Sequence, residues 1–326
     1  MDAFQPEIIK QLCIDSGFDL VGFAKPILPD FHREYLLSWV RDQKFGKMTW
    51  FPKEQSMEIR TDFRHLGFKP ASMICLGMVY RSEWGESTLE TLDSKVSRYA
   101  LGEDYHEVLR KKAEPILRYL RQAFPKNYFR QSVDTLPIME KVFAVKAGIG
   151  WMGKNTNVIH SELGSYFFIS TILTDCPWLV VEPVPTDHCG SCTSCLDACP
   201  TGALTAPYQL DASLCISHHT IEDRDPIFET GVELFGWQYG CDICQEVCPW
   251  NQTKAKRNQI ETKSQELLPK GIFAKVSGSL DLEMSEEDFR HHFKQTSIYR
   301  IGVDAWNRNV KKLREKRGDQ SIKEAK

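Results

Sequence analysis

Eight of the eleven cysteines in this 326-residue chain follow spacings that suit iron–sulfur chemistry. A first run, C-x2-C-x2-C-x3-C-P, covers residues 189–200, and a second run, C-x2-C-x3-C-P, covers residues 241–249. Cys215 stands alone between the two runs. This spacing is typical of the ligands of cubane [4Fe–4S] clusters. Eight thiolates suffice for two such clusters, which predicts one-electron transfer at low potential.

In runs of this kind the fourth cysteine binds the other of two clusters, and this rule divides the predicted ligands. Cluster one takes Cys189, Cys192, Cys195 and Cys248, and cluster two takes Cys199, Cys215, Cys241 and Cys244. The proline after each run fixes φ and lacks an N–H donor, so any helix must end there. Each run is therefore expected to end at the junction between the two clusters.

Two other interpretations of the cysteines are weaker. A zinc site needs four ligands and would leave half of the eight cysteines without a role. A disulfide framework suits small secreted chains rather than a chain of this length without a signal peptide. The remaining Cys13, Cys75 and Cys176 lie in apolar or loop sequence and are predicted to be small hydrophobic residues.

The overall composition, with 42% hydrophobic and 26% charged residues, is that of an ordinary soluble globular protein. A formal net charge of −3 argues against binding nucleic acid through overall charge. The first residues lack a basic region followed by an apolar run, and no segment approaches membrane-spanning length. We therefore expect a cytoplasmic protein that has no contact with a membrane.

Helical and strand-like patterns alternate along the first half of the chain and predict an α/β domain. Apolar or β-branched runs predict strands at residues 19–24, 71–80 and 165–174. A long amphipathic helix is expected over residues 105–124. Its apolar face comprises Val108, Leu109, Ala113, Ile116, Leu117 and Leu120. Pro115 lies within this stretch and is expected to kink or split the helix.

A proline-rich stretch marks the end of the first predicted domain, residues 1–185. The cluster module follows at residues 186–251, and residues 252–326 are predicted to be helical. Within this last segment, Ser285-x-x-Asp288 predicts a capping box at the start of a helix. The last dozen residues are rich in Lys, Glu, Gly and Gln and are expected to be partly disordered. The fold class is therefore predicted as α+β.

Residues 148–153 spell G-x-G-x-x-G, the pattern of a dinucleotide-binding turn. Such a turn follows a strand and opens a helix. This stretch follows a helical pattern instead and carries the bulky Trp151 and Met152. Nucleotide binding is therefore not predicted, and the glycines indicate that the backbone passes close to a ligand or a packed element.

Several motifs together resemble the epoxyqueuosine reductase family, and the resemblance spans nearly all of residues 5–310. They are RYALGEDYH from Arg98, VDTLPIMEK from Val133, AGIGWMGKNTNVI from Ala147, LGSYFFIS from Leu163, CGSCTSCLDACPTGAL, LCIS and YGCDICQEVCPWN. The cysteine motifs alone fit many electron carriers. Their combination with Asp104-Tyr105-His106, Asp134 and the GWMGKN segment is what makes the resemblance specific.

The resemblance implies a cobalamin-dependent enzyme that reduces epoxyqueuosine to queuosine at the wobble position of tRNA. The epoxide oxygen would leave as water, which consumes two electrons and two protons. The resemblance also implies a reductive-dehalogenase-like N-terminal domain, a bacterial dicluster ferredoxin-like module, and a corrinoid between them that is reduced through the clusters. Two one-electron centres in series suit a two-electron reduction fed by a low-potential donor such as a ferredoxin or flavodoxin.

Asp134 matches the proton donor of that family. An acid that protonates a departing oxygen at pH 7 must hold its proton, which requires a pKa raised by burial or by nearby negative charge. The alternative for Asp134 is a turn or a helix N-cap, because aspartate is favoured at both. The resemblance favours the catalytic role.

Further positions match residues near the corrinoid in the family, and the resemblance implies the same contacts here. They are Arg60, Arg98, Tyr105, Asp134, Lys154, Asn155, Gly164 and Ser165, together with Ser217 and Asp242 beside cluster ligands. The cations would pair with the corrinoid phosphate or donate to its amides, and surface salt bridges are the alternative. No histidine pattern indicates a cobalt ligand, and His106 is expected to be structural or in a second layer around the site.

The chain departs from the family at His218, where an aromatic or apolar residue is usual, which leaves the packing near cluster two open. Longer members carry C-terminal helical repeats that this chain lacks, so tRNA recognition is expected to rest on the cluster module and the basic helix at residues 308–317. Two alternatives stay open: a corrinoid iron–sulfur reductase of another substrate, such as an organohalide, and a dicluster electron carrier without catalysis.

Overall fold

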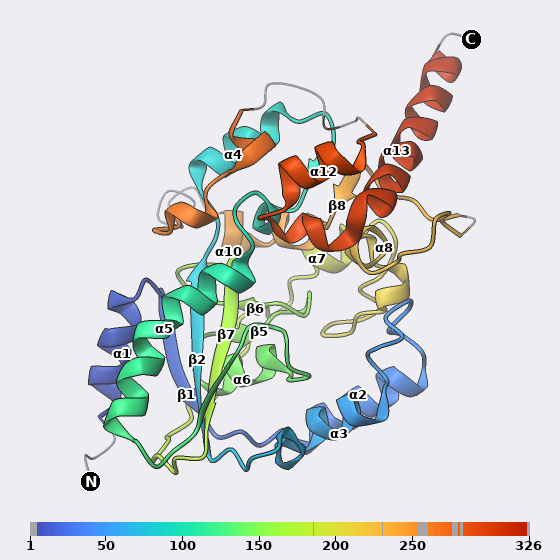
Figure 1. Ribbon diagram of the computed structural model, residues 1–326. Helices are drawn as coiled ribbons and strands as arrows, with labels where there is room; N and C mark the ends of the chain where they lie inside the picture. Colours follow the sequence, from blue (N-terminus) through green and yellow to red (C-terminus); the bar gives the residue numbers. More distant parts are fainter. Residues whose placement is uncertain are drawn as a thin grey trace.

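The computed structural model describes residues 5–184, 186–229, 231–252, 260–275, 280 and 283–324. An antiparallel sheet with helices packed against it forms one end of the molecule, and the cysteine-rich module and the C-terminal helices form the other (Figure 1). No helix in the described part of the chain has both the length and the apolar character needed to cross a membrane.

The central sheet has the strand order β1-β2-β7-β4, and each neighbouring pair is antiparallel. These strands are β1 (Leu20–Ala24), β2 (Ser72–Val79), β4 (Phe129–Ser132) and β7 (Phe167–Thr174). The three predicted strands are therefore confirmed. Helices and strands alternate along the chain as expected, and antiparallel pairing gives the predicted α+β class.

β2 explains how the sheet separates two cores. All eight of its residues are buried. Ile74, Leu76 and Met78 pack into one hydrophobic core, whereas Cys75 and Val79 pack into another. Successive side chains of a strand point to opposite faces, so a strand covered on both faces reads as a continuous apolar run.

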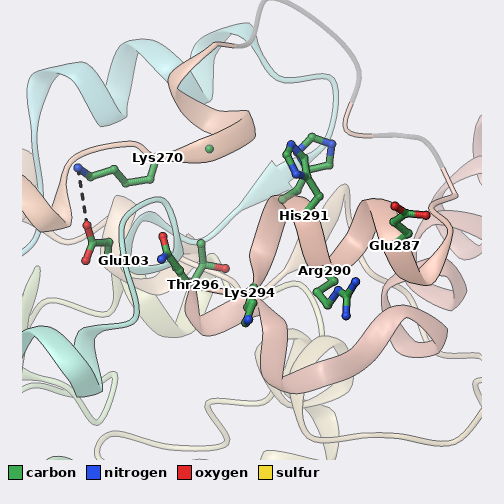
Figure 2. A pocket seen from close by; sticks show the side chains of 10 residues that line it. Glu103, Lys270, Glu287, Arg290, His291, Lys294 and Thr296 are labelled. Carbon is green, nitrogen blue, oxygen red and sulfur yellow. Dashed lines mark ion pairs between the residues drawn. The ribbon is translucent and has the colours of Figure 1, made fainter.

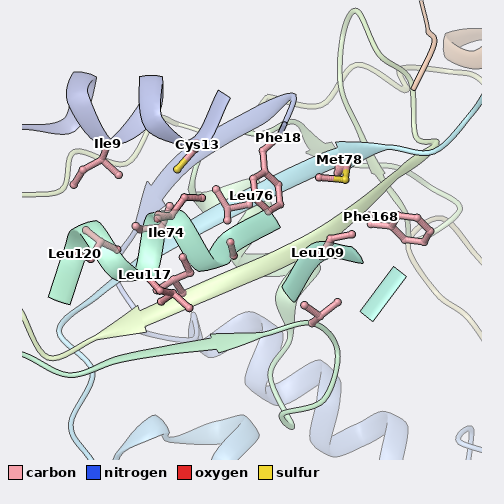
Figure 3. Packing of buried hydrophobic residues seen from close by; sticks show 14 of the residues in the cluster. Ile9, Cys13, Phe18, Ile74, Leu76, Met78, Leu109, Leu117, Leu120 and Phe168 are labelled. Atoms are coloured by element: carbon pink, nitrogen blue, oxygen red, sulfur yellow. The ribbon is translucent and has the colours of Figure 1, made fainter. Parts of the chain in front are cut away.

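On one face of the sheet lie α1 (Pro6–Asp15) and α5 (Tyr105–Ala123). Figure 3 shows Cys13 of α1 and the apolar residues of α5 over Ile74 of β2. All six residues predicted for the apolar face of α5 are buried. The helix runs through Pro115 without a break, so the expected split is wrong. The apolar face packs against the sheet on both sides of the proline, which holds the two halves in one helix.

On the other face lie α3 (Glu54–Thr61) and α6 (Glu140–Lys146), whose Phe143 packs against Phe63. α2 (Asp30–Arg41) extends away from the sheet toward the cysteine-rich module (Figure 1). The indole N–H of Trp39 in α2 donates to the carbonyl of Leu210, 2.6 Å away. Further helices and strands outside the central sheet are α4 (Glu83–Thr91), β5 (Trp151–Met152), β6 (Val158–Ile159), α7 (Ser194–Asp197), α8 (Ile216–Ile221), α9 (Ile243–Glu246) and α10 (Pro249–Gln252).

A short parallel pair joins the first domain to the module. β3 (Lys95–Val96) pairs with β8 (Trp237–Tyr239), which ends just before Cys241. α12 (Glu286–Phe293) and α13 (Gly302–Glu324) share a core with this pair. Trp237 and Tyr239 are fully buried in this region, as expected for packing residues. The strand that leads into the second cysteine run is therefore held from both sides.

The C-terminal helices confirm one prediction and correct another. Ser285 caps α12: its hydroxyl oxygen accepts from the N–H of Asp288 at 3.1 Å and donates to the carboxylate at 2.7 Å. α13 continues to Glu324, so most of the dozen residues expected to be disordered are helical. Lys, Arg, Glu and Gln dominate this stretch and are good helix formers, whereas the composition alone suggested disorder.

Candidate active site and cluster ligands

The four cysteines predicted for cluster one line a single cavity. This cavity has a volume of about 240 Å³ and is lined by Cys189, Cys192, Cys195 and Cys248, with Trp250 on its wall. Burial raises the pKa of the Cys248 thiol, and the neighbouring thiolates of the other three cysteines raise it further. The first three ligands of one run and the last ligand of the other therefore share one space.

The four cysteines predicted for cluster two lie close enough for their charges to act on one another. Burial raises the pKa of Cys241, and the charges of Cys215 and Cys199 add to this effect. Burial also raises the pKa of Cys244, with Cys241 and Cys215 as the next causes. Buried thiols ionise only when positive charge compensates, and the irons of a cluster supply it.

Among the described residues, no three His, Cys, Asp or Glu side chains converge as ligands of a single metal ion. In a cubane each thiolate binds a different iron, so the four sulfur atoms stand further apart than around one zinc.

Lys154 and Asn155, predicted as corrinoid contacts, hold the two cysteine runs. The ammonium of Lys154 donates to the carbonyls of Gly190 at 2.6 Å and Cys192 at 2.9 Å. The amide of Asn155 donates to the carbonyl of Cys244 at 3.1 Å. These two adjacent residues therefore fasten one run each to the first domain.

Gly164 and Ser165 meet the end of the second run. The carboxamide of Asn251 accepts from the Ser165 N–H at 2.9 Å and donates to the Ser165 hydroxyl oxygen at 2.9 Å. The Ser165 hydroxyl donates in turn to Gln245 at 2.8 Å. Gly164 has φ +65°, and a Cβ there would lie 2.0 Å from Oδ1 of the Asn251 side chain. Glycine is required because the module docks directly on this backbone.

Arg98 and Asp242 form one ion-pair cluster beside cluster two. The guanidinium of Arg98 donates to Asp242 at 3.1 Å and to Glu246 at 2.7 Å, both within the second run. Two further bonds, of 2.7 and 2.9 Å, reach Glu86 of α4. Three carboxylates thus surround a guanidinium that is 13% exposed. Its predicted contact with the corrinoid stays a prediction, and the arrangement shows that Arg98 fixes the cysteine loop.

Asp134 lies in the turn between β4 and α6, beside the first turn of α5. The Tyr105 hydroxyl donates to one carboxylate oxygen of Asp134, and Nε2 of His106 lies 2.6 Å from the other. The side chain of Asp134 is 53% exposed. Asp134 has φ +45° and does not cap α6, which begins after Met139 without a side-chain cap. Aspartate tolerates this left-handed conformation better than most residues, so the turn reading holds and the N-cap reading does not.

His106 was expected to be structural or in a second layer around the site, and its ring contacts both Asp104 and Asp134. Its Nδ1 lies 2.6 Å from Asp104 and its Nε2 contacts Asp134 directly. Burial opposes protonation of the ring, but the hydrogen bonds to Asp104 and Asp134 outweigh it and raise the pKa of His106 to about 9. Asp104 also caps α5 by accepting from the N–H of His106. That cap is a sequence signal for the ring position, since it holds His106 in the first helical turn.

Glu140 completes the surroundings of Asp134. Both of its carboxylate oxygens accept from the Asp134 backbone N–H at 3.2 Å. Burial, followed by the charge of Asp134, raises the pKa of Glu140 to about 8. The ammonium of the neighbouring Lys141 donates to Asn157 at 2.8 Å. The charges of the Cys244 and Cys215 thiolates act on this ammonium. Glu140 and Lys141 were not predicted as site residues, although both belong to the VDTLPIMEK motif.

Arg60, Ser217 and His218 lie apart from Asp134. Arg60 is buried over the ring of Phe51 at 3.7 Å, and burial lowers its pKa to about 10. It donates to the Phe51 carbonyl and has no carboxylate partner among the described residues. Ser217 lies in the first turn of α8, next to Cys215. The ring of His218 accepts from the N–H of Lys47 at 3.0 Å, which explains a polar residue at this position.

A polar pocket of about 680 Å³ lies between α12 and the segment around Gly271 (Figure 2). Its lining residues are Glu103, Lys270, Gly271, Glu287, Arg290, His291, His292, Lys294, Gln295 and Thr296. Lys270 pairs with Glu103 at 3.8 Å, whereas Arg290 and Lys294 are exposed and form no ion pair with any described residue. The carbonyl of Gln295 accepts from the N–H of Asp104 at 2.7 Å, so this pocket adjoins the Asp134 site.

The basic helix at residues 308–317 was expected to recognise tRNA, and Arg308 does not fit that role. Its guanidinium is buried and donates to the carbonyls of Asp223 and Asp225 at 2.8 Å and of His219 at 3.0 Å. Lys311 and Arg314 pair with Glu283. The first basic residue of this helix therefore joins α13 to the cysteine module.

Two family models match parts of the chain. Residues 60–135 match a model described as epoxyqueuosine reductase QueG, DUF1730. Residues 188–251 match the 4Fe-4S double cluster binding domain. The second match contains all eight predicted cluster ligands, so the chain carries a double-cluster domain.

Curated relatives extend the likeness over nearly the whole chain. The epoxyqueuosine reductase of Leadbetterella byssophila is 35% identical over 308 residues, which cover 94% of this chain and 97% of the relative. The epoxyqueuosine reductase of Escherichia coli K12 is 35% identical over 304 residues, covering 93% of this chain and 78% of the relative. A crystal structure of epoxyqueuosine reductase with an epoxyqueuosine-modified tRNA-Tyr stem loop matches with a TM-score of 0.77 at 28% identity, covering 93% of this chain and 79% of that one.

Proposed function

Because the chain belongs to the epoxyqueuosine reductase family, we propose that it reduces epoxyqueuosine to queuosine at the wobble position of tRNA. The observation that carries this proposal is the pairing of two chemistries in one chain. Eight cysteines fall into two groups of four, and a carboxylate with a tyrosine and a histidine on its two oxygens lies in the domain to which they dock. The cysteines would carry electrons, and the carboxylate with its two partners would carry protons. A reductive deoxygenation needs both.

The cysteine module receives electrons one at a time from a low-potential donor such as a ferredoxin or flavodoxin. Lys154, Asn155 and Arg98 bond to the loops that carry the ligands of both clusters. Fixed ligand loops favour rapid electron transfer, because little of the surrounding structure has to move when a cluster changes its charge. These residues therefore act on the electron path by holding the clusters in place.

A corrinoid fits the donor set of the first domain. Arg60 offers a buried guanidinium with one backbone acceptor and no carboxylate partner among the described residues, which suits an anionic group such as a phosphate. When bound, the corrinoid supplies the low-potential cobalt that delivers two electrons to the epoxide. Arg60 would hold it, and the half-exposed carboxyl of Asp134 would face the substrate oxygen.

Asp134 passes a proton to the oxygen that leaves. The Tyr105 hydroxyl donates to this carboxylate and orients it. Burial, and then the charge of Asp134, raise the pKa of Tyr105 far above its usual range, so the phenol remains a donor. The Asp134 backbone N–H is bonded to Glu140, which fixes the turn. Two oxygens with defined partners leave the carboxyl in one orientation, as proton transfer to a bound substrate requires.

The pocket beside α12 suits the phosphates of the anticodon loop. Arg290 and Lys294 line this pocket (Figure 2), and both are exposed and unpaired among the described residues. Gln295, which also lines the pocket, connects it to the Asp134 site through its bond to Asp104. A single-stranded loop is held by phosphate contacts while one base enters the site. This pocket replaces the α13 surface as the proposed RNA contact, because the first basic residue of α13 is buried.

The test uses protein reconstituted anaerobically with both clusters and cobalamin, a strong reductant, and tRNA that carries epoxyqueuosine. Mass spectrometry of the digested nucleosides is expected to show loss of one oxygen. If no conversion occurs while iron and corrinoid are verified in place, the proposal fails and other reducible substrates, organohalides included, replace it.

A further inference from the structure

The ring of His106 lies between two carboxylates, and this arrangement fixes a number of protons. Nδ1 is 2.6 Å from Asp104 and Nε2 is 2.6 Å from Asp134. A neutral imidazole has one N–H and can therefore donate to only one of them. The other nitrogen would then present a lone pair to a carboxylate lone pair, which is repulsive at this distance. One additional proton must be present among the three groups.

The groups around the ring favour holding that proton on His106. At the N-cap of α5, Asp104 contacts Nδ1, and the charge of Arg110 helps to lower the pKa of Asp104. On the turn before α6, Asp134 faces Nε2, and the charge of Glu140 lies behind its backbone N–H. Tyr105 donates to the far oxygen of Asp134, and Arg300 acts on the Tyr105 hydroxyl. Two carboxylates thus face the ring directly, and both stabilise the imidazolium.

Asp134 is more exposed to solvent than His106. Its side chain is 53% exposed, whereas that of His106 is 18% exposed. Both oxygens of Asp134 meet donors, the Tyr105 hydroxyl and the ring of His106. The geometry therefore separates two tasks: Asp134 reaches the substrate, and its neighbour stores the proton.

We propose that His106 is a positioning residue that holds the proton which Asp134 delivers to the departing oxygen; this rests on the proposed function. In the transfer, the Nε2–H bond of the imidazolium breaks, the proton passes to Asp134, and Asp134 passes a proton to the substrate oxygen. The ring is left neutral with its remaining N–H on Asp104. No electron moves in this step, and solvent at the exposed carboxyl restores the proton and supplies the second one that the reduction consumes.

The raised pKa of His106, about 9, supports this assignment and sets the first test. Histidine-selective 15N NMR follows the ring in protein that carries oxidised clusters and no cobalamin or tRNA, with His106→Gln to assign the signal. We expect the ring to titrate near that value. A midpoint below about 7.5 would leave the ring mostly neutral at working pH and would overturn the proposal.

Asp104→Asn gives a matched variant that keeps the helix. Asparagine caps a helix as well as aspartate does, so the fold of α5 is retained while the charge facing Nδ1 is lost. The midpoint of His106 is expected to fall by at least about one pH unit. The exposed His65, which pairs with Glu58, serves as control: His65→Gln should leave the His106 signal unchanged. An unchanged midpoint in Asp104→Asn would contradict the proposed hold on the proton.

Single-turnover deoxygenation gives the second readout. In Asp104→Asn, the alkaline fall of the rate should move to lower pH by the same amount as the NMR midpoint. In His106→Gln, the rate should fall at least about tenfold at pH 7, with tRNA affinity retained. A pH profile that does not move while the NMR midpoint does would overturn the role in proton delivery. Absence of turnover in the wild type instead rejects the proposed function and leaves the titration result standing.

Discussion

The cysteine module and the proton site around Asp134 are built in opposite ways. The module has only short helices, and side chains of the first domain, among them Lys154 and Ser165, bond directly to its loops. The proton site stands on a long helix and the edge of a sheet, yet its acid is half exposed on a turn at positive φ. Electron transfer requires fixed centres, whereas proton delivery requires contact with substrate and solvent.

The two regions also differ in the partners that their side chains contact. Lys154, Asn155 and Ser165, which match the family's corrinoid contacts, are hydrogen-bonded to the module, and their contact with a corrinoid stays a prediction. Asp104, Tyr105, His106 and Asp134 are hydrogen-bonded to one another, and within the described part of the chain none of these four side chains is hydrogen-bonded to a cysteine run. Changes in one region are therefore expected to leave the chemistry of the other intact, and the following predictions test that independence.

The largest effect is expected from removing a ligand that lies outside both runs. Cys215→Ser should abolish cluster two, lower the iron content from about eight to about four atoms per chain, and abolish turnover. Cys176→Ser is the control, because Cys176 is buried in a loop away from both groups and should keep about eight irons. Iron analysis of anaerobically purified protein is the measurement. A full iron content in Cys215→Ser would reject the assigned ligand set.

Gly164→Ala should loosen the module from the sheet domain. The left-handed backbone costs about 1–2 kcal/mol for alanine, and displacement of Asn251 adds to it. Gly67→Ala is the matched control, since Gly67 has φ +83° and open space around its Cβ position. Protease sensitivity of the module should rise only in Gly164→Ala, while the NMR midpoint of His106 stays unchanged. Equal sensitivity in the two variants would mean that Asn251 does not anchor the module.

Stability should depend on pH through the proton site. The folded pKa of His106, about 9, exceeds the ordinary value of about 6.5, so its stabilising effect is complete below pH 6.5 and disappears as pH rises through 9. Glu140, raised to about 8, acts in the same direction. The wild type should therefore exceed His106→Gln by about 2–3 kcal/mol in free energy of unfolding at pH 6, and by little at pH 10. Denaturant titrations at both values measure it, and a difference that is constant with pH would contradict the assignment.

The smallest effect concerns the RNA surface. Arg290→Glu combined with Lys294→Glu should weaken tRNA binding about tenfold and flatten its salt dependence, because two phosphate contacts are lost. Lys311→Glu serves as control, since that lysine pairs with Glu283 on another surface. Binding measured at several salt concentrations discriminates between them. If Lys311→Glu alone weakened binding, the α13 surface would be the RNA contact after all.

The cysteine spacing predicts the two ligand groups, because three ligands of cluster one come from the first run and two ligands of cluster two come from the second. The apolar face of α5 was equally readable from helical periodicity. The partners of Lys154 and Arg308 could not be predicted from the sequence. The group that a long cationic side chain contacts depends on segments that are distant in the sequence. The contact of His106 with Asp134 could not be predicted either, because it joins α5 to a turn 28 residues away.

The most direct test of the account is Asp134→Ala measured for electrons and protons together. Iron content and the EPR signals of both reduced clusters should match those of the wild type. Conversion of epoxyqueuosine in tRNA to queuosine, followed by mass spectrometry, should fall at least about a hundredfold. Unchanged conversion, or clusters lost together with activity, would contradict a proton site that is separate from the electron path.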